Sequence, residues 1–540
     1  MKKLNELKFE ELSTDQKLGM VMAGIIRPIR CEDKYETYDE NLEFVLNLIR
    51  NHSLGAVWVP PQCERSAEAI QKVKEVADYP ILIFTDAESG FLGGKHFVGR
   101  HNSIGMTGSE ELAYTFGKVV AIEARNAGYN VVCDPVVDMR NGWASTGGNT
   151  RSLGNNPEMV SKIAIAMSRG LHDGGVLSVA KHYPSAQKPE YSMDSHMAPS
   201  NCLDTKEDLL NYSLLPYLAL MKEGLLDGIM CGHATLANID PGMPSTVSKK
   251  VHDLIREQGF DGFFVTDALD MMGLKAKFGD TKAKGMCVEA GNEFILPWFS
   301  ARKAYFDLQD CYRDGVISEA RLDEAVKRVL EAQHKVNMIQ PKFNEITEKD
   351  EKDFERINRE SIFARADEGF DIPISRDGKH FIVMTVENET DIADTGKVSV
   401  DTFTNSWYRP ELIQEKLLEK FPNSTVRALR KFPTPNNNMD VLQDSVDYDD
   451  VVFITNVEAP AYAGSDHITH RNVALITALQ ISGRLQTLVH FGNPYPLEEL
   501  PHIPRVIIGC MSTDSTMAAI DILAGEQEAK GVLTYDIKLK

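Results

Sequence analysis

Residues 262–271 read GFFVTDALDM, and residues 176–184 read VLSVAKHYP. Each stretch starts with an apolar run and turns polar where that run ends. A buried parallel strand produces such a run, and the residues after it lie at the carboxyl edge of the sheet, where an α/β barrel keeps its chemistry. The polar residues include Asp267, whose carboxylate could act as a nucleophile. Nearby in the sequence, Asp194 and His196 form a pair that could move a proton.

The same pattern repeats from the N-terminus to about residue 300. Seven apolar runs predict strands, and the amphipathic segments between them, such as Ser109–Ala127, predict helices. This alternation is typical of a parallel sheet covered by helices, and so many units favour a closed (β/α)8 TIM-like barrel over an open sheet. Gly19–Ile26 fits either a strand or a helix. The predicted strands are Gly55–Pro60, Pro80–Thr85, Asn130–Cys133, Val176–Ala180, Gly228–Cys231, Gly262–Val265 and Glu293–Leu296.

A charged stretch separates this barrel from a second pattern of strands and helices. With 540 residues, the chain is too long for one core. We expect helices and a charged connector over residues 316–370, followed by a smaller open-sheet α/β domain. The sequence thus predicts a catalytic barrel at 1–340, a charged helical linker at 341–370 and a C-terminal α/β sandwich domain at 371–540. Its predicted strands are Phe381–Val386, Ser424–Leu429, Val451–Thr455, Thr487–Phe491 and Arg505–Gly509.

The composition excludes several classes of partner. The formal net charge of −21 repels phosphate backbones, so we expect no nucleic-acid partner. No stretch approaches the ~20 apolar residues of a membrane span. The opening MKKLNELKFEEL lacks the apolar core of a secretory signal. GxGxxG and GxxxxGK[ST] motifs are missing from the sequence, so nucleotide binding has no support.

The eight cysteines are scattered and form no CxxC pair. Most lie in apolar stretches, as buried free thiols do. We therefore expect neither disulfides nor a zinc site, and we expect the protein to be cytoplasmic.

Polar residues end several predicted strands: Asp86, Asp134, Lys181 with His182, His233 and Asp267. A single strand-end Asp could equally cap the next helix. Five such positions on successive strands would instead converge on one rim of a barrel. Acids mixed with Arg151, Lys181 and His182 suit a ligand rich in hydroxyls, such as a sugar, better than a dianionic phosphate.

Several motifs follow one another along nearly the whole chain: LSTDQKLG at 12–19, TDAESG at 85–90, EARNAG at 123–128, DPVVD at 134–138, TRSLG at 150–154, KHYP at 181–184, DSH at 194–196, PSTVSKK at 244–250, GFDGFFVTDALDM at 259–271 and FGNPY at 491–495. In this order they resemble glycoside hydrolase family 3, and within it the β-N-acetylglucosaminidase (β-N-acetylhexosaminidase) branch. The DSH and TDALDM segments are the most specific.

The resemblance implies a retaining, exo-acting β-N-acetylhexosaminidase that hydrolyses small glycosides without a metal or an organic cofactor. It makes Asp267 the nucleophile and His196 the general acid/base, held by Asp194. It assigns Asp86, Arg151, Lys181 and His182 to binding of the sugar. A retaining glycosidase does need a carboxylate and a second group that gives and takes back a proton. Asp270 is the rival nucleophile, but Asp267 is favoured because it ends the strand, whereas Asp270 is expected to start the next helix.

The sequence departs from the branch between KHYP and DSH. Relatives usually carry K-H-F-P-G-H-G, whereas residues 181–190 here read KHYPSAQKPE. Because glycines let a loop move, we expect the 185–190 loop to be stiffer or differently shaped.

Three alternatives stay open. One is a β-N-acetylglucosaminide phosphorylase, since a neutral His base does not repel phosphate. Another is a β-glucosidase or other exo-glycosidase of the same family. The third is a sugar-binding homologue that has lost catalysis through the altered 185–190 loop.

Overall fold

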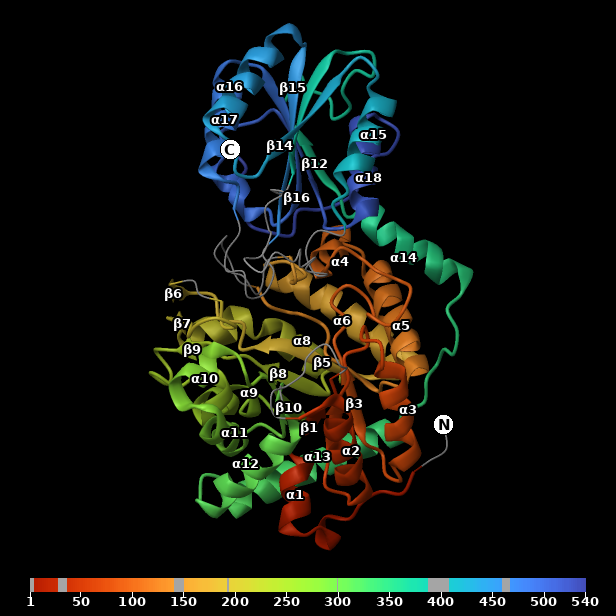
Figure 1. The fold of residues 1–540 in the computed structure, drawn as a ribbon, viewed down its shortest axis with the longest axis vertical. Coiled ribbons are helices and arrows are strands. Elements are labelled where there is room, and N and C mark those ends of the chain that lie inside the picture. Colours follow the sequence, from red (N-terminus) through yellow and green to blue (C-terminus); the bar gives the residue numbers. More distant parts are fainter. Residues whose placement is uncertain are drawn as a thin grey trace. The chain divides into compact units, whose positions relative to one another are not determined.

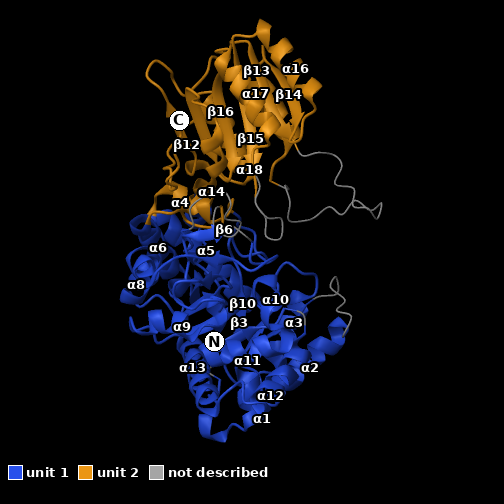
Figure 2. Ribbon diagram, turned by 90° about the vertical axis from the view of Figure 1, so that its left-hand side faces the viewer, with its two compact units in different colours: residues 1–97, 110–140, 157–352 blue, residues 98–109, 141–156, 353–540 orange. Residues whose placement is uncertain are grey.

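The computed structural model describes residues 4–27, 36–139, 150–191, 194–298, 300–386, 407–458 and 467–540. The chain separates into two compact units, coloured differently in Figure 2. The first unit contains residues 1–97, 110–140 and 157–352, and the second contains residues 98–109, 141–156 and 353–540. Residues 98–109 and 141–156 therefore group with the second unit although they precede most of the barrel in sequence.

The first unit is built on a parallel eight-stranded sheet that curls into a barrel (Figure 1). Its strand order is β1-β2-β3-β4-β5-β8-β10-β11. A parallel bridge between Met22 and Ile295, with the Ile295 amide donating to the Val21 carbonyl at 3.0 Å, joins the last strand to the first. The predicted barrel is thus confirmed. The strands are β1 Ala23–Ile25, β2 Ala56–Trp58, β3 Leu82–Thr85, β4 Val131–Val132, β5 Leu177–Tyr183, β8 Gly228–Cys231, β10 Phe263–Ala268 and β11 Phe294–Leu296.

Amphipathic helices cover the outside of the barrel. Helices α5 (Glu110–Ala127) and α6 (Pro157–Gly174) approach each other so closely that a Cβ on Gly117 would lie only 2.1 Å from the Met167 carbonyl oxygen. None of the described helices has the length and apolar character that crossing a bilayer requires. The helices of this unit are α1 Thr14–Met20, α2 Tyr38–Arg50, α3 Ser66–Val76, α5 Glu110–Ala127, α6 Pro157–Gly174, α7 Lys206–Asp208, α8 Leu215–Lys222, α9 Lys249–Arg256, α10 Met272–Phe278, α11 Asp280–Ala290, α12 Ala301–Arg313 and α13 Glu319–Met338, with α14 Glu348–Glu360 following at the connector.

The structure differs from the predicted elements in three places. The ambiguous segment Gly19–Ile26 contains both the end of α1 and strand β1. A small sheet of β6 (Pro189–Tyr191), β7 (Asn201–Cys202) and β9 (Thr235–Leu236) lies beside the barrel strands and was not predicted. Residues 316–370 are not wholly helix and connector, because β12 (Phe363–Ala366) pairs antiparallel with β17 (Arg505–Gly509).

The second unit contains a six-stranded sheet with the order β12-β17-β16-β15-β13-β14. Every pair of neighbouring strands in this sheet is parallel, except that β12 and β17 are antiparallel. The predicted open-sheet α/β fold is confirmed. The other strands are β13 His380–Val386, β14 Thr425–Arg430, β15 Asp450–Val457, β16 Leu485–Gly492 and β17 Arg505–Gly509, and the helices are α4 His101–Thr107, α15 Pro410–Lys420, α16 Pro435–Asp444, α17 His470–Ile481 and α18 Thr513–Leu523.

The side chains of β13 alternate between two apolar cores. Phe381 and Val383 belong to the core formed with α16 and α17, whereas Ile382 and Met384 belong to the core formed with α15 and α18. Figure 1 shows these helix pairs on opposite faces of the sheet. A strand buried on both faces reads as a continuous apolar run, which is why this strand was predictable.

A buried carboxylate at the start of β11 supports the base of the barrel. Glu293 is fully buried. It accepts hydrogen bonds from Arg256 at 3.1 Å, from Arg321 at 2.8 Å and from the Phe264 amide at 2.6 Å. We expect Glu293→Gln to lower the free energy of unfolding of the barrel by about 3 kcal/mol, because the arginines lose their buried counter-charge. Denaturant unfolding of both proteins measures this difference.

Glu324→Gln is the matched control. Glu324 contacts the same kind of partners, Arg321 at 3.3 Å and Arg328 at 3.6 Å, but its side chain is 57% exposed. An exposed pair contributes about 1 kcal/mol at most, so this variant should unfold almost like the parent. Equal, small losses in both variants would contradict a structural role for the Glu293 charge.

Candidate active site

Polar side chains gather at the carboxyl edge of the barrel sheet. They come from the ends of five strands, or from the one or two residues that follow them. Because these strands are parallel and adjacent or near neighbours in the sheet, their ends meet at one rim. The residues are Asp86, Asp134, Lys181, His182, His233 and Asp267.

Lys181 is the buried centre of a charge cluster. Its Nζ lies 2.5 Å from Asp86 Oδ1 and 2.9 Å from Glu88 Oε1, and its side chain is 2% exposed. Burial acts to lower the pKa of Lys181, but Asp86, Glu88 and Asp134 outweigh it and raise that pKa above its usual value. Burial in turn raises the pKa of Asp86, against the opposing effect of Lys181. The cluster offers an ammonium donor and a carboxylate acceptor side by side, as hydroxyl binding requires.

His182 lies between two carboxylates. Its Nδ1 donates to Asp138 Oδ2 at 2.7 Å, and Asp138 is buried. Its Nε2 lies 4.0 Å from Asp267 Oδ2. Asp138 therefore fixes the ring so that its other nitrogen faces Asp267.

Asp267, the penultimate residue of β10, carries an ionised carboxylate. The Ala268 amide donates to its Oδ1 at 2.7 Å. Burial acts to raise the pKa of Asp267, but His182, His233, His196 and this amide outweigh the burial, and the pKa lies below its usual value. The group is thus a carboxylate at neutral pH, as a nucleophile must be.

Asp270 has the opposite electrostatic environment. Burial raises the pKa of Asp270, and the Asp267 charge adds to the effect. Asp270 also does not start the next helix as predicted, because α10 begins at Met272 with Met271 as its N-cap. Asp270 lies in the turn between β10 and α10, and its environment makes it the weaker nucleophile of the two.

His233 supports the end of β10 through contacts of both ring nitrogens. Burial lowers the pKa of His233, which favours the neutral ring. Its Nε2 lies 3.0 Å from the Ala268 carbonyl oxygen, and because a carbonyl only accepts, Nε2 carries the hydrogen. Nδ1 lies 2.6 Å from the Thr246 hydroxyl oxygen, and that hydroxyl donates its hydrogen to the Gly232 carbonyl at 2.6 Å. The ring thereby fixes the backbone next to Asp267.

Asp194 and His196 form a tight local pair. Asp194 Oδ1 accepts from His196 Nδ1 at 2.7 Å and from the His196 amide at 3.0 Å. The Asp194 side chain is nearly buried, whereas that of His196 is 18% exposed. A histidine held at Nδ1 can exchange a proton through Nε2, which suits general acid/base chemistry.

The altered loop 185–190 is anchored by backbone hydrogen bonds. The amides of Gln187 and Lys188 donate to the two carboxylate oxygens of Asp204, at 2.9 and 2.8 Å. Asp204 is fully buried. The Met139 amide donates to Ser185 Oγ at 3.0 Å, and Pro189 starts strand β6. Of these contacts, only the one to the Ser185 hydroxyl depends on a side chain that replaces a glycine.

The predicted site residues divide between the two units. Asp86, Lys181, His182, Asp194, His196 and Asp267 belong to the first unit. The contacts above pair Lys181 with Asp86, His182 with Asp267 and His196 with Asp194. Arg151 belongs to the second unit, where its carbonyl accepts from His101 Nδ1 at 3.1 Å.

Two residues of the site were not among the predicted ones. Glu88 and Asp138 lie within the TDAESG and DPVVD motifs, but their partners, Lys181 and His182, come from another strand. From the sequence, only their position inside those motifs could have indicated that these two residues belong to the site.

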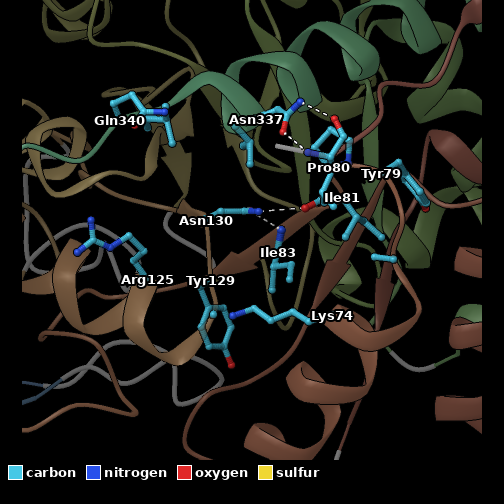
Figure 3. Close-up of a pocket in the computed structure, with 15 residues that line it drawn as sticks. Lys74, Tyr79, Pro80, Ile81, Ile83, Arg125, Tyr129, Asn130, Asn337 and Gln340 are labelled. Carbon is cyan, nitrogen blue, oxygen red and sulfur yellow. Dashed lines mark hydrogen bonds between the residues drawn. The ribbon is translucent and has the colours of Figure 1, made fainter. Parts of the chain in front are cut away.

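A cavity lies at the opposite edge of the barrel, where β3 and β4 begin. This cavity of about 190 Å³ is lined by 15 residues, none of them an acid or a histidine. Figure 3 shows Asn130 bonded to Ile81 and Ile83, and it shows the guanidinium of Arg125 pointing away from Tyr129, beside which Lys74 ends. Its lining includes Lys74 and Arg125 but no carboxylate, so this cavity lacks the paired acids and histidines found at the carboxyl edge. The candidate site is therefore the carboxyl edge.

The comparisons with known proteins point to the same chemistry. The family model described as glycosyl hydrolase family 3 N terminal domain matches residues 16–332. The chain is 27% identical over 337 residues to a β-N-acetylglucosaminidase/β-glucosidase of Cellulomonas fimi, covering 59% of this chain and 57% of that protein. It is 32% identical over 186 residues to a β-hexosaminidase of Methylococcus capsulatus, covering 34% of this chain and 54% of that protein. The chain thus spans little more than half of these relatives.

Solved structures share the fold over the whole chain. A glycoside hydrolase family 3 β-N-acetylglucosaminidase from Paenibacillus sp. aligns with a TM-score of 0.77 at 23% identity, covering 98% of this chain and 100% of that one. A β-glucoside phosphorylase named BglX, bound to 2FGlc, aligns with a TM-score of 0.79 at 22% identity, covering 98% of this chain and 95% of that one. At such identities the likeness concerns the fold alone.

Proposed function

The chain belongs to glycosyl hydrolase family 3, and on that premise we propose that it is a retaining, exo-acting β-N-acetylhexosaminidase. One observation carries the proposal: Asp267 lies at the end of β10, and the turn with the Asp194–His196 pair is hydrogen-bonded to the start of α10, the helix that follows β10. A retaining glycosidase needs these two functions, a nucleophilic carboxylate and a group that gives and takes back a proton. The choice of sugar is supported by relatives named β-hexosaminidase.

In the proposed mechanism, Asp267 attacks the anomeric carbon of the terminal sugar. His196 gives its proton to the departing glycosidic oxygen, so the bond to the aglycone breaks as the glycosyl ester forms. Water then gives a proton to His196 and attacks the ester, which releases the sugar with its original configuration. Asp194 holds the ring in the orientation that both transfers need.

We propose that the charge cluster binds the hydroxyls of the sugar. Lys181 can donate to a hydroxyl oxygen, and Asp86, with its side chain 41% exposed, can accept from a hydroxyl hydrogen. Glu88 keeps the Lys181 ammonium in place. His182 is placed by Asp138 beside the nucleophile. The assignment of Arg151 to this subsite stays a prediction from the sequence.

We also propose a cytoplasmic location. Seven cysteines lie within the described residues, and each is a free thiol, buried except for the half-buried Cys63. Thiols of this kind persist in a reducing compartment.

A panel of aryl β-glycosides, assayed with and without phosphate, tests the proposal. We expect the N-acetylglucosaminide to be hydrolysed faster than the glucoside, xyloside and galactoside, with free sugar as the product in both buffers. A sugar 1-phosphate product would instead identify a phosphorylase. A preference for the glucoside would identify a β-glucosidase. No turnover, together with no covalent 2-fluoro-sugar adduct on Asp267, would identify a sugar-binding protein.

The pH profile should reveal the effect of His182 on the nucleophile. Apart from burial, which acts in the opposite direction, His182 has the largest effect on the pKa of Asp267, and it lowers that pKa. Activity falls as the pH drops through this pKa, because only the carboxylate attacks. We therefore expect His182→Gln to raise the pKa of Asp267 and to move the acid limb of kcat/KM toward higher pH.

His52→Gln is the control for this measurement. His52 pairs with Asp78 at 2.9 Å on the surface and is not among the groups with the largest effects on the pKa of Asp267. The acid limb of kcat/KM in the His52→Gln variant should match that of the parent enzyme. An unchanged acid limb in His182→Gln would show that another group sets the limb.

A further inference from the structure

The turn that carries the Asp194–His196 pair is attached to the start of α10. The Met272 amide donates to the His196 carbonyl at 3.2 Å, and the Gly273 amide donates to the Ser195 carbonyl at 2.9 Å. The N-cap of α10, Met271, makes no side-chain capping hydrogen bond. The turn thus satisfies backbone donors that the first turn of a helix otherwise leaves without partners.

Gly273 lets the two segments come this close. A Cβ built on it would lie 2.9 Å from the Ser195 carbonyl oxygen, 3.3 Å from Ser195 Cβ and 3.4 Å from His233 Cβ. The first contact is with backbone, which cannot rotate away as a flexible side chain can. Any larger residue at position 273 must therefore push the DSH turn away from α10.

The same helix start is firmly connected to the nucleophile. Leu269 and Met271, which link β10 to α10, are buried. The Leu269 amide donates to the Leu296 carbonyl at 3.1 Å, and the Met271 amide donates to the Ala268 carbonyl at 3.2 Å. His233 contacts both ends of this link. Its ring binds the Ala268 carbonyl, and its Cβ faces Gly273. Asp267 and the DSH turn are thus joined through one short, packed segment.

We propose that Gly273 is a positioning residue that sets the place of His196 relative to Asp267. The proposal rests on the proposed function, and it adds that the acid/base turn takes its position from the first turn of α10. A methyl group at position 273 displaces the Ser195 carbonyl and with it the His196 ring. Proton transfer depends on distance, so it suffers before sugar binding or nucleophilic attack does.

Gly273→Ala tests the proposal through its dependence on the leaving group. For an alkyl N-acetylglucosaminide, whose departing oxygen needs a proton, we expect kcat/KM to fall about 30-fold or more. For a 2,4-dinitrophenyl glycoside, which needs none, we expect it to stay within about threefold. The rate of labelling of Asp267 by an activated 2-fluoro-sugar should also persist, which shows that the fold and the nucleophile are intact.

Gly232→Ala is the matched control at the same rim. A Cβ there would meet no atom closer than 3.5 Å, which is an ordinary contact. Both substrates should therefore react with it as with the parent enzyme. Unchanged kcat/KM for both substrates in Gly273→Ala, or an equal loss on both, would overturn the proposal. Activity of the parent enzyme is measured alongside, so failure of this proposal is distinct from failure of the proposed function.

Met272→Pro gives a second test that adds no bulk at Gly273. Residue 272 is the first residue of α10, where proline fits, and Met271 has the extended ψ of 133° that a following proline requires. The change removes the amide that donates to the His196 carbonyl. We expect the same selective loss on the alkyl glycoside. A variant with parental activity on both substrates would show that the turn does not depend on α10.

Discussion

Asp267→Ala should abolish turnover, lowering kcat by about 10⁴-fold or more, equivalent to about 5.5 kcal/mol of transition-state stabilisation. The reason is that no glycosyl ester can form without this carboxylate. The protein should fold normally, because Asp267 lies at the rim of the barrel and its loss removes no apolar contact from the core. Steady-state kinetics and a thermal unfolding curve measure the two effects.

Two further measurements separate a lost nucleophile from general damage. Azide is small enough to occupy the space left by the carboxylate and can attack the anomeric carbon in its place, so it should restore turnover of a dinitrophenyl glycoside and give a glycosyl azide. Asp270→Ala is the control, because burial makes that carboxyl the weaker nucleophile. A kcat for Asp267→Ala above about a hundredth of the parent value would remove Asp267 as nucleophile.

The fold was largely predictable because its sheets leave strong local signals. Strands buried on both faces, such as β10 and β13, read as unbroken apolar runs. Strand β12 escaped prediction because its four residues are all only half-buried and it pairs at the edge of the sheet. Strands β7 and β9 have two residues each and show no periodicity at all.

The site was predictable as far as its residues stand at strand ends or in recognisable motifs. Asp267 and Lys181 follow apolar runs, and the DSH motif marks Asp194 and His196. The role of Asp138 depends on its contact with His182, 44 positions further along the chain, and only the folded barrel creates that contact. Gly273 was invisible for the same reason, since its importance comes from the approach of Ser195. Contacts between distant segments leave no local pattern.

His196→Ala should slow substrates with poor leaving groups far more than activated ones. General acid catalysis contributes about 10²–10⁴-fold, so we expect a loss of that size in kcat/KM for an alkyl N-acetylglucosaminide. For a dinitrophenyl glycoside the departing oxygen needs no proton, and kcat/KM should stay within about tenfold of the parent. Hydrolysis of the glycosyl ester also loses its base, so this substrate should give a burst of dinitrophenol followed by a slow steady state.

Asp194→Asn should show a milder version of the same selectivity, and together the two variants test the pair. The amide side chain introduced by this change can still accept a hydrogen bond from Nδ1 of His196, as the carboxylate does at 2.7 Å, but it carries no charge. The ring then keeps its approximate orientation and loses the electrostatic support of its partner, by analogy with the acid that orients a catalytic histidine. Ser195→Ala is the control within the same turn, since it preserves the carbonyl that Gly273 contacts.

An equal loss on alkyl and dinitrophenyl glycosides in His196→Ala, without a burst, would mean that His196 binds the substrate or supports the turn, and that the proton comes from another group.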